Sequence, residues 1–220
     1  LEAAFAAAQN GDEVKILVAG SYPLPSGKNI TVTGAVPGVE FDNINKHAMG
    51  GASITFNNVT FNYAMTSSHN GLQHSGNLAY NNCIINGQVF LYGTSETFNN
   101  CTFNQTDVNN YNVWTYSAKD VAFNGCTFNS AGRSVLIYGD GGDLVAQVAV
   151  TDCKFVSSQA VDGKAAIEMD SSLIAGINLT IDNATTAEGF GSGSVSGNSL
   201  WNNKKGNSDA ANNDITVVVN

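Results

Sequence analysis

The sequence has little charge, almost no arginine and no long apolar run, and each shortage excludes a class of partner. Only 12% of the 220 residues are charged, Arg133 is the single arginine, and 18 acidic residues against 9 basic ones give a net charge of −9. Nucleic acid and anionic membrane surfaces are bound through clustered Lys and Arg, so neither is an expected partner. Insertion into a bilayer is not expected either, because no apolar run approaches the roughly 20 residues needed to span it.

Asn and Gly, by contrast, are abundant. The chain has 29 Asn and 23 Gly, and the Asn stand mostly in short clusters between apolar segments. A disordered chain would have few aromatic residues, whereas this one has 11 Phe, 7 Tyr and 2 Trp. We therefore expect the Asn clusters to be turns in an ordered β protein.

A seven-residue block, Phe-Asn-Asn-Val-Thr-Phe-Asn at 56–62, recurs along the chain. Copies stand at 80–86, 98–104 and 123–129, with weaker ones at 150–155 and 181–186. The central position of the block holds Val59, Cys83, Cys101, Cys126, Cys153 and Ala184, at steps of 24, 18, 25, 27 and 31 residues. Steps of this size fit one coil of a β-solenoid.

Each block has the pattern of a strand, a tight turn and a second strand. Apolar and polar residues alternate on both sides of the Asn pair, as in half-buried strands, and Asn or Gly at the turn tolerates a left-handed backbone. A third apolar segment lies between blocks, at 89–92, 113–116, 135–138 and 166–169. The sequence therefore predicts an all-β parallel β-helix with three strands per coil.

The start of the chain resembles a known superfamily. Residues 1–12, LEAAFAAAQNGD, look like the short amphipathic helix that caps right-handed β-helices of the pectin-lyase-like superfamily, and 14–24 and 30–34 are similar to its first coils. The resemblance implies one right-handed β-helix domain over 1–220, with a cap helix at 1–12, coils over 14–186, and a C-terminal cap loop and strand over 187–220. It leaves the function open, because this architecture hosts lyases, hydrolases, phage tailspikes and adhesins alike.

The Asn-rich blocks most resemble secreted or surface β-helix proteins of gut bacteria, many of them described as adhesins. This resemblance implies an extracellular or cell-surface location. The chain begins without Met or a basic leader segment, and we expect it to be part of a longer surface protein.

The four cysteines occupy one position of the repeat, so we expect them to stack inward as a structural ladder of small side chains. Metal binding is not expected, because no Cys or His partner stands at ligand spacing. His47, His69 and His74 have no such spacing among themselves. Disulfides between adjacent coils stay open on distance alone, although parallel Cβ vectors suit the bond poorly.

One charged constellation resembles the centre of pectate-lyase-like enzymes. In that reading Asp140, Glu168 and Asp170 surround a calcium ion, and Lys164 or Arg133 removes a proton beside a uronate carboxylate. The basic pair would share a ladder if Gly132-Arg133 aligns with Gly163-Lys164. The alternative is that these residues form a solvated charged face, and we favour this interpretation over the lyase centre. The G-H-G and R-x-K motifs of polygalacturonase-like hydrolases are absent.

A column of aromatic residues offers a second site. It contains His74, Tyr92, Tyr116 and Tyr138, with Trp114 two residues before Tyr116. Pointing outward, the column would form a stripe on which sugar rings stack; pointing inward, it is core. The alternate column of Leu91, Thr115, Ile137 and Glu168 contains a charge, so parity favours the inward orientation without settling it.

Glu96 breaks the apolar pattern. It stands where other copies of the repeat have Ile54, Leu78 and Val121. A register shift caused by the short 18-residue step is the favoured explanation, and a buried carboxylate is the alternative.

These patterns predict a binding or adhesion module for a polysaccharide or host glycan, without a cofactor. The candidate ligand-binding residues are Tyr92, Tyr116, Tyr138, Trp114 and His74. A calcium-dependent uronate lyase is the alternative, and a scaffold or tailspike-like repeat without a small ligand is the third hypothesis. The low basic content and the missing hydrolase motifs favour binding over catalysis.

Overall fold

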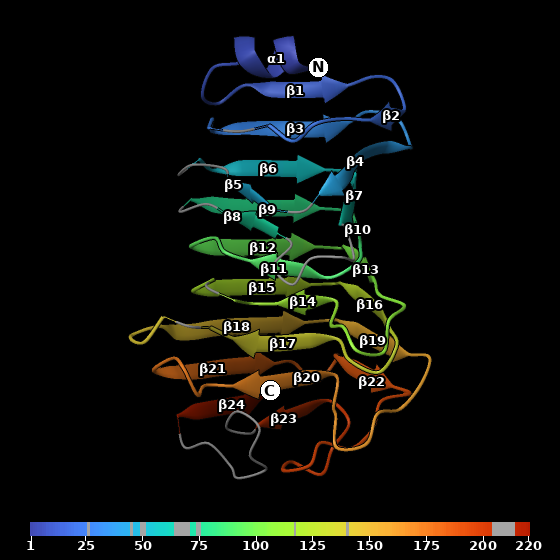
Figure 1. Cartoon of the computed structure of the whole chain (residues 1–220), viewed down its shortest axis with the longest axis vertical. Coiled ribbons are helices and arrows are strands. Elements are labelled where there is room, and N and C mark those ends of the chain that lie inside the picture. Colours follow the sequence, from blue (N-terminus) through green and yellow to red (C-terminus); the bar gives the residue numbers. More distant parts are fainter. Residues whose placement is uncertain are drawn as a thin grey trace.

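The computed structural model describes residues 1–25, 27–44, 46–48, 52–63, 71–73, 76–116, 118–139, 141–203 and 214–220. This described part is all β apart from a short helix, α1 (Glu2–Ala7), and its strands form three parallel sheets. From β3 onward the chain visits sheets A, B and C in turn, and we call each such circuit a pass. Successive passes stack along the long axis of the molecule (Figure 1), an arrangement consistent with a β-solenoid.

Sheet A contains, in spatial order, β1 (Glu13–Ile16), β3 (Ile30–Gly34), β6 (Ile54–Asn57), β9 (Asn77–Asn81), β12 (Ser95–Asn99), β15 (Asp120–Asn124), β18 (Val145–Thr151), β21 (Gly176–Ile181) and β24 (Ile215–Val219). Sheet B contains β2 (Gly20–Ser21), β4 (Val39–Ile44), β7 (Thr60–Tyr63), β10 (Ile84–Asn86), β13 (Thr102–Asn104), β16 (Thr127–Ser130), β19 (Lys154–Ser157) and β22 (Thr186–Glu188). Sheet C contains β23 (Trp201–Asn203), β20 (Ile167–Asp170), β17 (Val135–Tyr138), β14 (Val113–Trp114), β11 (Val89–Leu91), β8 (Gly71–Gln73) and β5 (Lys46–Ala48).

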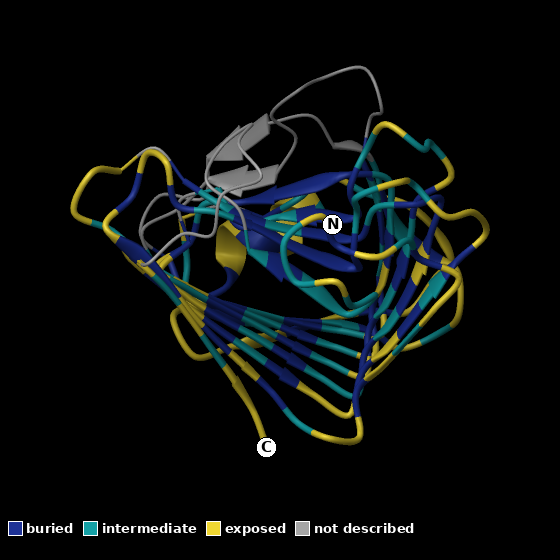
Figure 2. Ribbon diagram, turned by 90° about the horizontal axis from the view of Figure 1, so that it is seen from below, coloured by how far each residue is buried: buried dark blue, intermediate teal, exposed yellow. Residues whose placement is uncertain are grey.

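One hydrophobic core receives side chains from all three sheets. Figure 2 shows buried residues alternating with more exposed ones along the strands, as the period of two requires. Equal positions of the repeat lie directly above one another, so the aromatic residues form stacks with ring centroids 4.4 Å apart in Tyr80–Phe98 and in Phe128–Phe155. Such offset stacking adds to the free energy gained by burying the rings.

The turn between sheets A and B confirms the predicted left-handed backbone. Asn58, Asn82, Asn100 and Asp152 have φ between 51° and 55°, and Gly125 has φ 62°. The four cysteines that follow this turn are buried and form no disulfide. Each thiol lies 3.3–3.5 Å from the carbonyl oxygen two residues before it. The inward cysteine ladder is therefore present as predicted.

The last copy of the repeat differs by one residue from the prediction. Strand β22 pairs Thr186 with Lys154, and the backbone N–H of Cys153 donates to Thr185 Oγ1 at 3.2 Å. Thr185 therefore continues the cysteine column, and Ala184 does not. The turn of this pass contains one extra residue, because Ile181 pairs with Val150 in the preceding strand of sheet A.

Asn side chains form two hydrogen-bonded ladders on the outside of the molecule. In sheet A the amides of Asn81, Asn99 and Asn124 each donate to the Asn of the preceding pass at 2.8–2.9 Å. In sheet B the amides of Asn86, Asn104 and Asn129 do the same at 2.7–2.9 Å. The first and third Asn of the block thus form these two ladders. The second Asn forms the left-handed turn, and there the Asn82 amide also donates to Asn58 Oδ1 at 3.3 Å.

The two ends of the molecule differ from the predicted boundaries. Helix α1 spans only Glu2–Ala7; its Phe5 packs into the core, and Lys28 Nζ donates to the carbonyl oxygens of Phe5 and Ala8. At the other end, β24 joins sheet A beside β21, and the unpredicted β23 joins sheet C. Within the described residues, no helix has the length and apolar character needed to cross a membrane.

Gly125 allows a test of the repeat. Both Gly125→Asn and Gly125→Val place a Cβ atom 2.6 Å from Asn100 Oδ1, so the Asn100 amide must shift in either variant. Only valine also strains the left-handed backbone, by about 1–2 kcal/mol. We expect Gly125→Asn to change the free energy of unfolding by less than about 1 kcal/mol and Gly125→Val to be less stable than Gly125→Asn by that strain energy. Denaturant unfolding of both variants measures the difference, and equal midpoints would contradict it.

Candidate functional site

The candidate site lies on the outer face of sheet C. The core-facing residues of this sheet are Val89, Leu91, Val113, Val135, Ile137, Ile167 and Met169. Because side chains alternate along a strand, the residues between and after them point outward. Register and ring contacts arrange these residues in two columns, the first with Phe90, Trp114, Leu136, Glu168 and Asn202, the second with Tyr92, Tyr116, Tyr138 and Asp170.

The prediction that the aromatic column faces the core is therefore wrong. It depended on placing Glu168 opposite Ile137, which put a charge on the other face of the sheet. In the structure Glu168 pairs with Leu136, and Met169 pairs with Ile137. The third apolar segment of this pass was predicted at 166–169, whereas β20 spans Ile167–Asp170. A shift of one residue assigns every side chain of this strand to the opposite face of the sheet.

Six rings form a continuous aromatic face: Phe90, Tyr92, Tyr111, Trp114, Tyr116 and Tyr138. Phe90 lies against Trp114 with ring centroids 4.9 Å apart, and Tyr116 lies 5.5 Å from Tyr92 and 5.8 Å from Tyr138. Tyr111, from the loop before β14, meets Trp114 edge-on at 5.9 Å. Tyr92, Trp114, Tyr116 and Tyr138 are half-buried. Their packing fixes the ring positions and leaves part of each ring open to solvent.

Two hydrogen-bond donors on this face lack a partner among the described residues. Trp114 Nε1 and Arg133 Nε are both buried and make no hydrogen bond. The Arg133 guanidinium lies 5.7 Å from the centre of the Tyr111 ring, a cation–π contact. A buried donor without an acceptor is costly, so these two groups are polar features of the face that the protein itself does not satisfy.

A polar cluster borders the aromatic face where β20 and β23 continue it. Glu168 is 1% exposed, and Asn202 is fully buried beside it. Glu168 accepts hydrogen bonds from the Ala165 N–H at 2.8 Å and from Asn202 Nδ2 at 3.2 Å, and its Oε2 lies 3.4 Å from Lys164 Nζ. Asp170, opposite Tyr138, accepts the Ser172 N–H at 2.9 Å.

The charges of this cluster act on one of the aromatic residues, Tyr111. Burial raises the pKa of Tyr111, the Glu168 carboxylate raises it further, and the Arg133 guanidinium opposes the rise. Tyr111 therefore keeps its hydroxyl proton and offers a donor at the border between the rings and the charges.

The described residues bring only part of the predicted lyase constellation together. Asp140 lies outside them. Lys164 and Glu168 form an ion pair, but Arg133 and Lys164 lie outside the paired residues of β17 and β20, and Gly132, next to Arg133, lies against Val161 and not against Gly163. Among the described residues no group of three His, Cys, Asp or Glu side chains is placed to hold a metal ion. His69 and His74 lie outside the described residues, and of His47 only the backbone is described.

Glu96 is a buried carboxylate, so the register shift predicted for it is wrong. It pairs in register with Leu78 on one side and Val121 on the other, and it is 1% exposed. Its Oε1 accepts the Gly93 N–H at 2.8 Å, whereas its Oε2 is buried without a hydrogen-bond partner. Burial raises the pKa of Glu96 to about 8, against the effect of hydrogen bonds from the Gly93 and Tyr92 backbone.

Comparison with protein-family models, curated proteins and solved structures gave no match to this chain. The resemblance to the pectin-lyase-like superfamily therefore stays a prediction, and the site has to be interpreted from its own residues.

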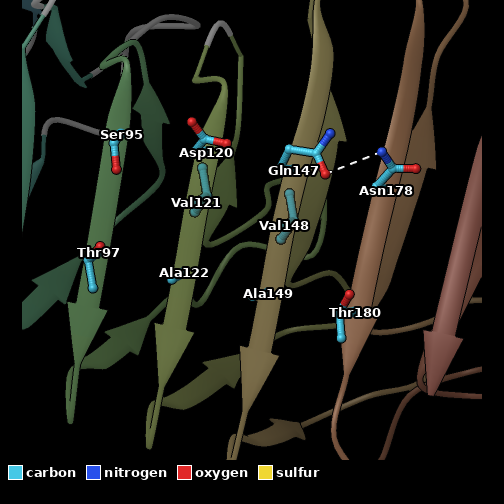
Figure 3. A pocket seen from close by; sticks show the side chains of 10 residues that line it. All are labelled: Ser95, Thr97, Asp120, Val121, Ala122, Gln147, Val148, Ala149, Asn178 and Thr180. Atoms are coloured by element: carbon cyan, nitrogen blue, oxygen red, sulfur yellow. Dashed lines mark hydrogen bonds between the residues drawn. The ribbon is translucent and has the colours of Figure 1, made fainter. Parts of the chain in front are cut away.

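A concave surface lies on the outer face of sheet A, on strands β12, β15, β18 and β21 (Figure 3). It is a shallow groove of about 300 Å³, lined by Ser95, Thr97, Asp120, Val121, Ala122, Gln147, Val148, Ala149, Asn178 and Thr180. Gln147 Oε1 accepts the Asn178 amide at 3.2 Å. Its lining contains no aromatic ring, so it lacks the stacking surface that sheet C offers.

Proposed function

We propose that this chain is an extracellular or cell-surface binding module, a right-handed β-helix that holds a polysaccharide or host glycan on its aromatic face. The observation that carries the proposal is the outward placement of four half-buried rings on β14 and β17 and just after β11 and β14: Tyr92, Trp114, Tyr116 and Tyr138. A contiguous apolar patch on the outside of a soluble protein is typical of a binding site.

The chemistry of the face suits a sugar. Aromatic rings stack against the apolar faces of sugar rings, and nearby polar groups orient the hydroxyls. Trp114 Nε1 and Arg133 Nε are donors without a protein acceptor, while Asp170, opposite Tyr138, supplies a carboxylate at the edge. Strands about 4.8 Å apart repeat this combination along the axis of the stack, which suits a chain of repeating units.

Two features favour binding over a calcium-dependent lyase. Glu168 already accepts hydrogen bonds from Ala165 and Asn202 and is paired with Lys164, so its oxygens are engaged within the protein. Calcium takes six to eight oxygen ligands, and a carboxylate that is 1% exposed offers it little access.

The test is glycan binding by the full chain and by Tyr116→Ala. Tyr116 contacts both neighbouring tyrosines, so its removal opens the middle of the face. We expect at least about a fivefold loss of affinity for the polysaccharide that binds best, because truncating a central aromatic residue costs more than about 1 kcal/mol. Tyr116→Phe keeps the ring and should keep most of the affinity. Isothermal titration measures all three proteins.

Gln147→Ala is the matched control, because Gln147 is an exposed side chain in the groove of sheet A. It should bind as the unmodified chain does. Unchanged binding by Tyr116→Ala, or loss of binding by Gln147→Ala, would contradict the proposed face. Unsaturated uronate products that form with calcium and not with a chelator would favour the lyase, and failure to bind any glycan would favour the scaffold.

A further inference from the structure

The polar cluster beside the aromatic face brings an amine, a carboxylate and an amide together. Lys164 Nζ lies 3.4 Å from Glu168 Oε2, and Asn202 Nδ2 donates to the same oxygen at 3.2 Å. Asn202 is fully buried, Glu168 is 1% exposed, and the Lys164 side chain is 18% exposed. The Lys164 amine and the Asn202 amide therefore contact one carboxylate oxygen in a place that excludes most water.

The amide oxygen of Asn202 is held by two backbone donors. Asn202 Oδ1 accepts the Val195 N–H at 3.0 Å and the Ser196 N–H at 3.2 Å. The loop that carries these donors lies tightly against the Asn202 side chain, because a Cβ atom at Gly193 would stand 2.6 Å from Asn202 Cβ. Two N–H groups aimed at one carbonyl oxygen polarise its C=O bond, and they can stabilise the negative charge that this oxygen gains when a nucleophile attacks the carbon.

Glu168 is placed to carry protons between the other two groups. Its Oε1 accepts the Ala165 N–H at 2.8 Å, which fixes the carboxylate, and its Oε2 contacts both Lys164 Nζ and Asn202 Nδ2. A carboxylate within hydrogen-bond reach of a donor can take a proton as a general base and return it as a general acid. The three side chains thus supply a nucleophile, an electrophile and a proton carrier.

We propose that Lys164 and Asn202 react in the folded protein to form an amide bond between their side chains, with Glu168 as the proton carrier. Glu168 first takes a proton from the Lys164 ammonium group, which leaves a neutral amine. The amine turns from Oε2 toward Asn202 Cγ and attacks it, so that the Nζ–Cγ bond forms and Oδ1 holds the negative charge beside the two backbone N–H groups.

The second half of the reaction releases ammonia. Glu168 passes its proton to Asn202 Nδ2, the C=O bond forms again, and the Cγ–Nδ2 bond breaks. Glu168 then takes the surplus proton from Nζ and gives it to the departing ammonia, which leaves as ammonium. Lysine and asparagine have become one secondary amide and Glu168 is a carboxylate again, so no oxidant, reductant or further reactant is needed.

The bond would join the loop before β20 to β23. Strand β23 stands at the end of sheet C and pairs only with β20 among the described residues. The end of a stack of repeats has a neighbour on one side only, so it is a place where local opening is easy, and a covalent link holds it closed. This effect is independent of what the aromatic face binds. The contacts of Glu168 described above are those of the protein before the reaction, with Lys164 still its ion-pair partner.

The experiment follows the intact mass of the full chain during incubation in the folded state at neutral pH. We expect the unmodified chain to lose the mass of one ammonia. Lys164→Arg keeps a cation beside Glu168, but a guanidinium stays protonated and does not attack an amide, so this variant should keep its full mass. Lys154→Arg is the matched control, because Lys154 is an exposed lysine on β19, and it should lose ammonia as the unmodified chain does.

Glu168→Gln tests the proton carrier. It keeps an oxygen acceptor for the Ala165 N–H but cannot take the Lys164 proton, so it should keep its full mass over the time in which the unmodified chain reacts. Circular dichroism checks that each variant is folded. Lys164→Arg leaves the hydrogen bonds from Ala165 and Asn202 to Glu168 in place, so the comparison of masses does not depend on a variant that disturbs them.

Digestion of the unfolded product with a protease that cleaves after glutamate locates the bond. The chain has no Glu between Glu96 and Glu168 and none after Glu188, so complete cleavage gives fragments 97–168 and 189–220. We expect these two fragments to stay joined, because the first contains Lys164 and the second contains Asn202.

Full mass of the unmodified chain after incubation would overturn the proposal, and so would separation of the two fragments. Loss of ammonia that persists in Lys164→Arg would show that an asparagine had cyclised onto its own backbone. Hydrolysis of Asn202 to aspartate would show that water reaches Cγ before the lysine does. Joined fragments from Glu168→Gln would show that Glu168 is not the proton carrier.

Discussion

Replacing Glu168 with alanine is expected to lower the free energy of unfolding by about 3–5 kcal/mol, because it removes one member of a buried charged pair and leaves its partners unsatisfied. The Ala165 N–H and the fully buried Asn202 amide lose their acceptor, and Lys164 loses its counter-ion. These groups come from three parts of the chain: the loop before β20, β20 itself and β23. Glu168 therefore joins the last two strands of sheet C as well as bordering the aromatic face.

Glu168→Gln separates the hydrogen bonds from the charge. It keeps an acceptor for Ala165 and should cost about 1–2 kcal/mol, less than Glu168→Ala. Glu188→Ala is the matched control, because Glu188 is an exposed carboxylate at the end of β22 and its removal should be nearly neutral. Guanidinium unfolding followed by circular dichroism orders the variants. Equal midpoints for Glu168→Ala and Glu188→Ala would mean that the contacts of Glu168 add nothing to stability.

The repeat made the architecture predictable, because one strongly patterned unit is copied. A turn of Asn58, Asn82 or Asn100 needs a left-handed residue, and Asn is among the few that adopt it. Because the copies stack in register, a residue in one copy has the same position as its counterparts in the others. One copy with a clear pattern therefore predicts the structure of the weaker copies. The prediction was less accurate where copies diverge: the pass with Thr185 contains an inserted residue, and aligning the copy of the block at 181–186 placed Ala184 in the cysteine column.

The site was harder to predict, because its residues obey the same alternation as the core. Phe90 is 2% exposed although it points outward, since neighbouring rings cover it. Composition cannot distinguish such a residue from Leu91, which faces the core. Only the strand register distinguishes the two residues. Assigning the register requires knowing that β20 starts at Ile167, which pairs Glu168 with Leu136. The aliphatic residues in the two columns that contain Val89 and Leu91 were the signal that could have shown which side of the sheet faces the core.

Glu96 was misjudged for a related reason. A buried carboxylate is rare enough that a register shift looked simpler, yet shifting β12 would also move Phe98 out of the aromatic stack of sheet A. Keeping the ring in its stack outweighs the cost of burying one acid, provided that the acid can keep its proton. The burial of Glu96 that keeps β12 in register raises the pKa of this carboxyl group.

The same carboxylate gives the second large expected effect, a dependence of stability on pH that Glu96→Gln removes. The ordinary pKa of 4.5 applies to the unfolded chain and a pKa of about 8 to the folded one. Between these values the folded protein binds the extra proton, so the stability from this group is complete below about pH 4.5 and is lost as pH rises to about 8. At about 1.4 kcal/mol for each pKa unit, the loss amounts to roughly 3–5 kcal/mol.

Unfolding by guanidinium at pH 5, 7 and 9 measures this loss directly. Glu96→Gln should match the unmodified chain at pH 5 and exceed it by most of that free energy at pH 9. The carboxylates of Glu13, Asp42 and Asp182 act in the opposite direction, because hydrogen bonds lower their pKa values and their contribution falls only in acid. Both proteins carry these groups, so they cancel in the difference. A gap between the two proteins that stays constant from pH 5 to pH 9 would mean that Glu96 does not change its protonation on unfolding.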